Sequence, residues 1–174
     1  MLKRGVFIIM SMLMGCQPSQ ETAKADVYAV SGENTGQQIG YVTFTDTPQG
    51  IRVKTNLHNL PSGEHGFHIH EYPNCRAGTD ADGNVIPAQA AGGHFDPDKT
   101  GKHLGPDGHG HKGDMPALDV AADGTADTEF YLHNITVKDI RNHSIIIHAG
   151  GDNYQDEPLP LGGGGARIAC GIIE

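Results

Sequence analysis

The chain has 174 residues, a formal net charge of −9, only 6% aromatic residues and no tryptophan. Its length predicts one domain with a sound core, and its negative charge argues against nucleic acid as a partner. The 25 glycines and the few aromatic residues favour short strands and long turns over a helical bundle.

The first 15 residues have the pattern of a secretion signal. Lys3 and Arg4 precede a short apolar run, Val6–Met14, which is too short to span a bilayer as a mature helix. A frayed helix or a buried strand is the alternative, which the charged start and the cysteine disfavour. Leu13-Met14-Gly15-Cys16 resembles the cleavage box of bacterial lipoproteins. We therefore expect a lipoprotein signal peptide at 1–15 and a lipidated polar tether at 16–25.

Eight segments that follow have the composition or the alternation of β-strands. Polar and apolar residues alternate in the first three, as in antiparallel strands with one buried face. The segments are 26–31, 38–45, 50–57, 66–71, 118–120, 124–132, 144–148 and 166–173. No segment indicates a helix or an internal repeat. Eight strands with two long loops, at 72–117 and 149–165, predict an all-β Greek-key sandwich or barrel for the domain at 26–174.

The three cysteines, Cys16, Cys75 and Cys170, are an odd number for an exported protein. If Cys16 carries lipid, the other two remain as a pair, and an oxidising compartment lets them form a disulfide. Such a bond would close a loop of roughly 95 residues, for which the chain-entropy estimate is near 4.7 kcal/mol. Two separate buried thiols are the alternative.

Histidines and aspartates are concentrated in the stretch Gly92–Pro116, which has no apolar period. A loop this long inside a compact domain is usually functional or disordered. Imidazoles and carboxylates are ordinary zinc ligands, and a closed zinc site needs four of them. We expect a metal to order this loop through His94, His103, His111 and Asp114.

A second group of histidines lies on predicted strands. His68 and His70 are two residues apart in 66–71, so both side chains leave the same face. His148 ends the apolar segment 144–148 and adds a further imidazole. Two surface histidines that arose by chance are the alternative for the first pair. Together with the loop, six histidines and one aspartate suffice for two sites that share a ligand.

Seven motifs together resemble the signature series of bacterial copper,zinc superoxide dismutases. In the family's order they are GFHIHE, Asn74-Cys75, AGGHFDP, KHLGP, GHKGDMP, IIIHAGGDNY and GGGGARIACG. The resemblance covers nearly all of 26–174. It implies a flattened eight-stranded Greek-key β-barrel, an immunoglobulin-like sandwich, with two long functional loops. It also implies one copper and one zinc per chain.

The resemblance assigns roles residue by residue. It implies copper bound by His68, His70, His94 and His148, and zinc bound by His94, His103, His111 and Asp114, with His94 as the bridge. Arg167 matches the arginine that anchors the anionic substrate, and Asp152 matches the carboxylate that links ligands of the two metals. Cys75 and Cys170 match the family disulfide.

The implied activity is the dismutation of superoxide to oxygen and hydrogen peroxide, by alternate reduction and reoxidation of copper bridged to zinc through His94. A copper or zinc binding or delivery protein on the same barrel is the alternative. A zinc hydrolase is a third hypothesis, and it would need an open zinc position. The complete ligand sets and Arg167 favour the enzyme, because a carrier needs neither a bridging ligand nor a substrate anchor.

The remaining expectations concern the surface and the location. Lys99, Lys102 and Lys112 are candidates for steering superoxide, and solvated lysines are the alternative. His109 competes with His111 for one zinc position, and the resemblance to the family motif GHKGDMP selects His111. We expect His109 to lie at the surface, with adventitious metal binding as the alternative. His58, His65, His133 and His143 are expected to be structural or surface groups. We expect a periplasmic protein held by lipid on Cys16, in the outer membrane because Gln17 follows, and the resemblance allows a homodimer.

Overall fold

The computed structural model describes residues 20–174. The expected signal peptide and Cys16, with the first residues of the tether, lie outside the described residues. Within residues 20–174, no helix is both long enough and apolar enough to cross a membrane.

The described part of the chain is built almost entirely from antiparallel strands, which confirms the all-β class. The short helices are α1 (Val137–Ile140) and the 3-10 turns η1 (Gln89–Ala91) and η2 (Leu161–Gly163). The strands are β1 (Thr22–Ser31), β2 (Asn34–Thr47), β3 (Gly50–Leu57), β4 (Gly63–His65), β5 (Phe67–His70), β6 (Gly78–Thr79), β7 (Val85–Ile86), β8 (Leu118–Val120), β9 (Glu129–Leu132), β10 (Ser144–His148) and β11 (Arg167–Ile173).

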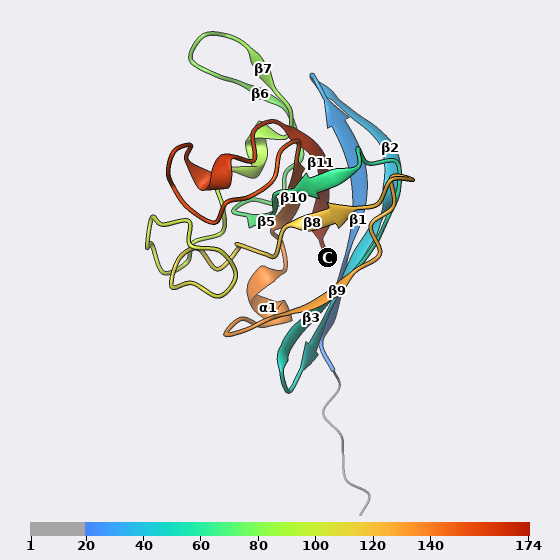
Figure 1. The fold of residues 1–174 in the computed structure, drawn as a ribbon, viewed down its shortest axis with the longest axis vertical. Coiled ribbons are helices and arrows are strands. Elements are labelled where there is room, and N and C mark those ends of the chain that lie inside the picture. The colour runs from blue at the N-terminus through green and yellow to red at the C-terminus, as the bar shows by residue number, and fades with distance from the viewer. Residues whose placement is uncertain (1–19) are drawn as a thin grey trace, which may run out of the picture.

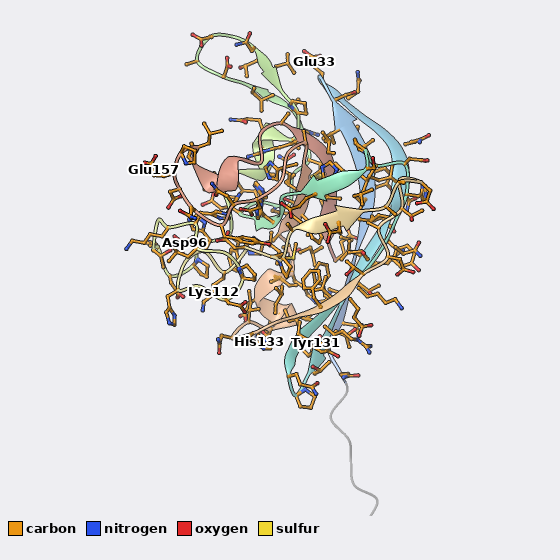
Figure 2. All side chains as sticks on the ribbon, in the orientation of Figure 1. Glu33, Asp96, Lys112, Tyr131, His133 and Glu157 are labelled. Atoms are coloured by element: carbon orange, nitrogen blue, oxygen red, sulfur yellow. A yellow bond between two sulfur atoms is a disulfide. The ribbon has the colours of Figure 1, made fainter. Side chains whose placement is uncertain are left out.

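One curled sheet of seven strands carries the fold, in the order β5-β10-β11-β1-β2-β3-β9 (Figure 1). Strands β4 and β8 pair separately across the open side, and β6 and β7 form a small hairpin at one end of the molecule. Side chains fill the space inside the curl, and the labelled Asp96 and Lys112 lie on the long loop to one side of the sheet (Figure 2). The two long loops cover the β5 end of the sheet.

The core follows from the alternation seen in the sequence. In β3, Ile51 and Val53 are fully buried while Arg52 and Lys54 are exposed. Strands β5 and β10 differ because they are buried on both faces. Phe67 and Ile69 of β5, like Ile145 and Ile147 of β10, belong to the main core.

The other face of β5 and β10 carries the functional side chains. Ile146 of this face packs in a smaller cluster with Cys170, and His68 pairs with Ile146 across the two strands. Because side chains alternate along a strand, His68, His70 and His148 lie on this outer face. The sheet therefore holds three histidines in register beneath the loops.

Several boundaries differ from the expected ones. Strand β1 begins at Thr22, inside the expected tether, because Ala23 and Ala25 are buried between β2 and β11. The expected strand 124–132 is regular only over β9. Strand β4 falls between two expected strands, and the loop 72–117 contains β6, β7 and η1.

The expectation of no helix was wrong for one turn. Helix α1 has only four residues, too few to show a helical period. A capping box holds it, because Asp139 Oδ2 accepts hydrogen bonds from the Thr136 amide (2.9 Å) and the Thr136 hydroxyl (2.6 Å).

The predicted disulfide is confirmed. Cys75, in the loop after β5, is bonded to Cys170 of β11, with 5.8 Å between the Cα atoms. The bond fastens this loop to the sheet beside the histidine-bearing face. Two separate thiols, the alternative, are excluded.

Candidate metal centre

Four histidines form the first group of metal-ligating side chains. His68 and His70 come from β5, His148 comes from the end of β10, and His94 comes from the loop. One ring nitrogen of each lies within 4.8 Å of the others. The backbone of His94 forms a bridge to His70, and Phe95 donates a 2.8 Å hydrogen bond to the Ile69 carbonyl. These bonds extend the β5 edge of the sheet and bring His94 to the strand histidines.

The second group consists of His94, His103, His111 and Asp114, also within 4.8 Å of one another. All four come from the stretch Gly92–Pro116, which we call the zinc loop. Asp114 Oδ1 lies 3.0 Å from His94 Nδ1 and 3.4 Å from His111 Nδ1, and Oδ2 lies 2.9 Å from His103 Nδ1. The two groups therefore share His94, through different nitrogens.

The histidines of both groups keep one nitrogen free of hydrogen bonds. Six buried ring nitrogens in the described part of the chain form no hydrogen bond: His68 Nδ1, His70 Nε2, His94 Nε2, His103 Nδ1, His111 Nδ1 and His148 Nε2. Those of His103 and His111 lie in ion-pair contact with the Asp114 carboxylate. Buried polar atoms normally find a partner. Nitrogens that are orphaned and clustered fit metal ions, and imidazoles with a carboxylate suit copper and zinc.

In each strand histidine, the ring nitrogen that is not free for a metal is held by a contact to a carbonyl or carboxylate oxygen. His70 Nδ1 is 3.0 Å from the Gly92 carbonyl, and His148 Nδ1 is 3.2 Å from the Gly165 carbonyl. His68 Nε2 is 2.6 Å from Asp152 Oδ2. Hydrogen bonds of this kind set the tautomer and the ring orientation of metal-binding histidines.

Burial sets the protonation of the first group. Desolvation lowers the pKa of His68 to about 3 and that of His148 to about 4, and it lowers the pKa of His70 well below its usual value. Neighbouring histidines lower these pKa values further. All three imidazoles are therefore neutral at pH 7, which is the form that binds a metal.

The second group has the opposite electrostatics. Burial alone would lower the pKa of His103, but the adjacent carboxylates of Asp114 and Asp152 outweigh it and raise the pKa to about 9. Burial acts to raise the pKa of Asp114, yet His103, His111 and His94 hold it far below its usual range. In the absence of metal, this group thus retains a proton.

Asp152 connects the two groups. Its two oxygens lie 2.6 Å from His68 Nε2 and 2.7 Å from His103 Nε2. Gly162 makes room for this carboxylate, because an added Cβ would lie 1.9 Å from Asp152 Oδ1 and the backbone has φ +73. A side chain at position 162 would displace the Asp152 carboxylate that connects His68 and His103.

Two residues that sequence reasoning missed bind the zinc loop from the second long loop. The Tyr154 hydroxyl accepts a hydrogen bond at 2.9 Å from the amide of Ala117, the residue that follows the zinc loop, and Asp156 Oδ2 accepts one from the His103 amide at 3.1 Å. With Asp152, alternate residues of one segment contact the zinc loop. Nothing in the local composition signals these contacts, since they depend on how the two loops meet.

Arg167 lies next to the strand histidines. The β10–β11 register pairs it with His148, and its guanidinium donates to the carbonyls of Ala88 (2.5 Å) and Gly92 (2.6 Å). The Gly92 carbonyl is also the acceptor for His70. Burial lowers the pKa of Arg167, but a guanidinium remains charged at all working pH values.

The other predicted histidines lie outside both groups. His65 is buried, with its ring nitrogens 2.7 Å from the His148 carbonyl and 2.9 Å from the Pro61 carbonyl. His143 packs on Phe95, while His58, His109 and His133 are exposed. The three candidate lysines also lie at the surface of the zinc loop, with Lys112 Nζ 3.6 Å from Asp98.

Comparisons with known proteins agree with this geometry. The sequence model of the family described as copper/zinc superoxide dismutase (SODC) matches residues 38–173. A superoxide dismutase (Cu-Zn) of Brucella melitensis is 43% identical over 175 residues, which cover 99% of this chain and 100% of the relative.

Two solved structures are also similar. That of the Cu/Zn superoxide dismutase from Brucella abortus has a TM-score of 0.85 and 44% identity, and it covers 88% of this chain and 100% of the relative. The monomeric copper, zinc superoxide dismutase from Salmonella enterica has a TM-score of 0.77 and 43% identity, with 90% and 100% coverage. The fold of these neighbours matches the curled antiparallel sheet described above.

Proposed function

The chain belongs to the copper/zinc superoxide dismutase family, and from this premise we propose how its residues divide the work. The copper is held by His68, His70, His94 and His148, and the zinc is held by His94, His103, His111 and Asp114. The supporting observation is that His94 belongs to both groups, with its Nε2 orphaned among the strand histidines and its Nδ1 facing Asp114.

The chain is an enzyme that converts two superoxide anions and two protons to oxygen and hydrogen peroxide. When bound, copper supplies the one-electron couple for this reaction, and zinc, which has no redox chemistry, supplies a fixed positive charge. The residues of the chain have three further tasks: to hold the substrate anion, to orient the ligands and to carry a proton.

Arg167 holds the anion. Two of its N–H groups are used by the carbonyls of Ala88 and Gly92, which fix the plane of the guanidinium. A guanidinium has five N–H groups, so donors remain for superoxide. The pairing with His148 places this positive charge beside the copper group. The anion is therefore attracted to the point where the electron is exchanged.

His94 carries the proton. Its Nδ1 is committed to the Asp114 side, so Nε2 is the atom that can take up a proton and give it to the product. Burial lowers the pKa of His94, which favours release of that proton. Asp152 orients His68 and His103 together, so the two metal groups keep one geometry.

Metal analysis and activity on the same preparation test these assignments. The wild-type chain should bind about one copper and one zinc and disproportionate superoxide. His148→Gln should lose copper and keep zinc, and His111→Gln should lose zinc first. A chain that holds both metals fully without activity would instead be a metal-binding or delivery protein. Retention of both metals by both variants would refute the ligand assignment.

The exported state fits the bacterial relatives and the disulfide. We infer further that Cys16 is lipidated after cleavage at Gly15, which would anchor the protein to the outer membrane. Residues 13–16 support this, as does the use of the other two cysteines in the disulfide. Mass spectrometry of the mature chain tests the lipid, and Cys16→Ser should release the protein into the soluble periplasm. The homodimer stays a prediction, which sedimentation tests.

A further inference from the structure

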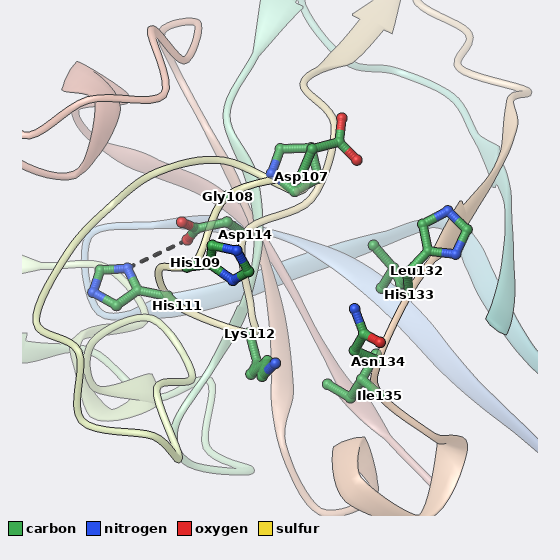
Figure 3. Close-up of a pocket in the computed structure, with 11 residues that line it drawn as sticks. Asp107, Gly108, His109, His111, Lys112, Asp114, Leu132, His133, Asn134 and Ile135 are labelled. Carbon is green, nitrogen blue, oxygen red and sulfur yellow. Dashed lines mark ion pairs between the residues drawn. The ribbon is translucent and has the colours of Figure 1, made fainter.

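A cleft of about 180 Å³ lies between the zinc loop and the turn that joins β9 to α1 (Figure 3). Two of the residues that line it, His111 and Asp114, belong to the proposed zinc group. Among that group, His111 has the most exposed side chain, at 8%, whereas the other three are at most 1% exposed. The cleft is therefore the side from which solvent reaches the zinc group.

Two further histidines line this cleft and have no role in the proposed mechanism. His109 belongs to the zinc loop, and His133 belongs to the turn after β9. His133 Nδ1 lies 2.8 Å from the Gln49 carbonyl. Because a carbonyl only accepts, Nδ1 carries the hydrogen and Nε2 keeps its lone pair. A backbone carbonyl fixes the tautomer of many metal-binding histidines in the same way.

His109 is placed by the glycines on either side. An added Cβ on Gly110 would lie 2.4 Å from the Lys102 carbonyl, and one on Gly108 would lie 2.4 Å from the Leu104 carbonyl. The backbone is therefore packed tightly on both sides of an exposed imidazole. This arrangement holds His109 at the surface, two residues from the zinc ligand His111.

The charges of the cleft favour a cation. Asp107 and Asp114 contribute two carboxylates. Lys112 contributes one ammonium group, and Asp98 partly balances it at 3.6 Å. A concave site lined by carboxylates concentrates cations and raises their rate of arrival.

We propose that this cleft is an outer zinc site, at which His109 and His133 hold the ion briefly on its way to and from the inner group. The proposal rests on the proposed zinc group. Within residues 20–174, the two imidazoles do not belong to any preformed cluster of metal donors. A transfer site has to bind weakly, because an ion held by four fixed ligands would stay there.

A site of this kind has a specific kinetic signature. Zinc that enters and leaves through the cleft passes the same two imidazoles in both directions. Removing them slows association and dissociation by the same factor and leaves the dissociation constant unchanged. Loss of a structural contact would instead speed dissociation and weaken binding.

The test uses zinc chloride and the full chain, freed of metal by chelation with the disulfide intact. Stopped-flow competition with a zinc indicator gives the association rate, and transfer from the loaded chain to excess chelator gives the dissociation rate. The double variant His109→Gln, His133→Gln should slow both rates about tenfold, the lower end of the effect of charge and local concentration. His58→Gln, a change at an exposed histidine elsewhere, should alter neither rate.

Wild-type rates in the double variant would overturn the proposal, and so would faster dissociation with weaker binding. If the proposed zinc group were wrong, the result would be different. The wild-type chain would then bind no zinc, or the His111→Gln variant would bind zinc as tightly as the wild-type chain. The two proposals are thus distinguished in one series of measurements.

Discussion

The two proposed metal groups are neighbours built in different ways. Three of the four proposed copper ligands lie on β5 and β10, and β10 pairs with β5 on one side and with β11 on the other. All four proposed zinc ligands lie in one loop. Backbone hydrogen bonds from both ends of the loop to Ile69 of β5, side chains from the second long loop and the ligands' own contacts hold it. The sheet therefore preorganises most of the proposed copper group, whereas the proposed zinc group depends more on its ion and on a few polar contacts.

The largest effect should come from the one residue that belongs to both groups. His94→Gln removes a ligand from each metal and the proton carrier. Loss of partners that only orient a ligand costs 10- to 100-fold, so activity should fall by more than about 100-fold. Assays of activity and metal content check this. His58→Gln, a change at an exposed histidine outside both groups, is the control, and a similar loss there would contradict the assignment.

Removing each metal in turn tests this difference between the two groups. Without zinc, backbone amides between 96 and 112 should exchange with solvent much faster, because few backbone hydrogen bonds hold this stretch. Without copper, the amides of β5 and β10 should remain protected. Hydrogen exchange followed by mass spectrometry measures both. Equal loss of protection in the two regions would show that the groups are not built differently.

The contacts from the second loop should affect zinc more than copper. Tyr154→Phe removes the acceptor of the Ala117 amide and Asp156→Asn weakens that of His103, at about 1 kcal/mol for each hydrogen bond. Zinc should dissociate several times faster while copper content is unchanged. Tyr131→Phe, on the exposed face of the sheet, is the matched control. Unchanged zinc dissociation would show that these contacts do not support the zinc group.

The pH dependence of the metal-free protein should also separate the groups. The lowered pKa values of His68 and His148, about 3 and 4, stabilise the fold above pH 6.5, and this stability is lost as the pH falls toward them. The raised pKa of His103, about 9, stabilises the fold below pH 6.5, and this stability is lost as the pH rises toward 9. Stability should therefore peak near pH 6.5.

Urea unfolding across pH 4 to 9 measures this dependence. The variant His103→Gln should lose the decline on the alkaline side alone, and zinc binding should remove it in the wild-type chain. A curve that keeps its alkaline decline in His103→Gln would assign that decline to another group.

The smallest effect concerns steering of the substrate. Replacing Lys99, Lys102 and Lys112 by glutamine should lower the rate of dismutation severalfold at low salt and little at high salt, since salt screens exposed charges. The salt dependence of the rate checks this. No change in that dependence would end the steering hypothesis.

The sequence predicted those features that have a short-range signal. The alternation in β3 and the pair His68 and His70 follow from the period of a strand. The disulfide was indicated by the odd number of cysteines, on the condition that Cys16 carries lipid, and by the resemblance to the family. Motifs in family order indicated the ligand groups, but no spacing rule alone would have joined β5, β10 and a distant loop.

What was missed depends on tertiary contacts. Ala23 and Ala25 have the composition of a tether, and only pairing with β2 and β11 makes them part of the core. Strands β6 and β7 have two residues each, and α1 has four, so no period could reveal them. Tyr154 and Asp156 gain their roles only where the two loops meet.

The early start of β1 has a consequence for where the enzyme works. If Cys16 carries lipid, the six steps from Cys16 to Thr22 can reach roughly 20 Å at most. That end of β1 and the β6–β7 hairpin lie at opposite ends of the long axis (Figure 1). A tether this short would confine the domain to a layer at the membrane surface that is about one molecular diameter deep. Superoxide would then be removed beside the bilayer, before it spreads through the periplasm.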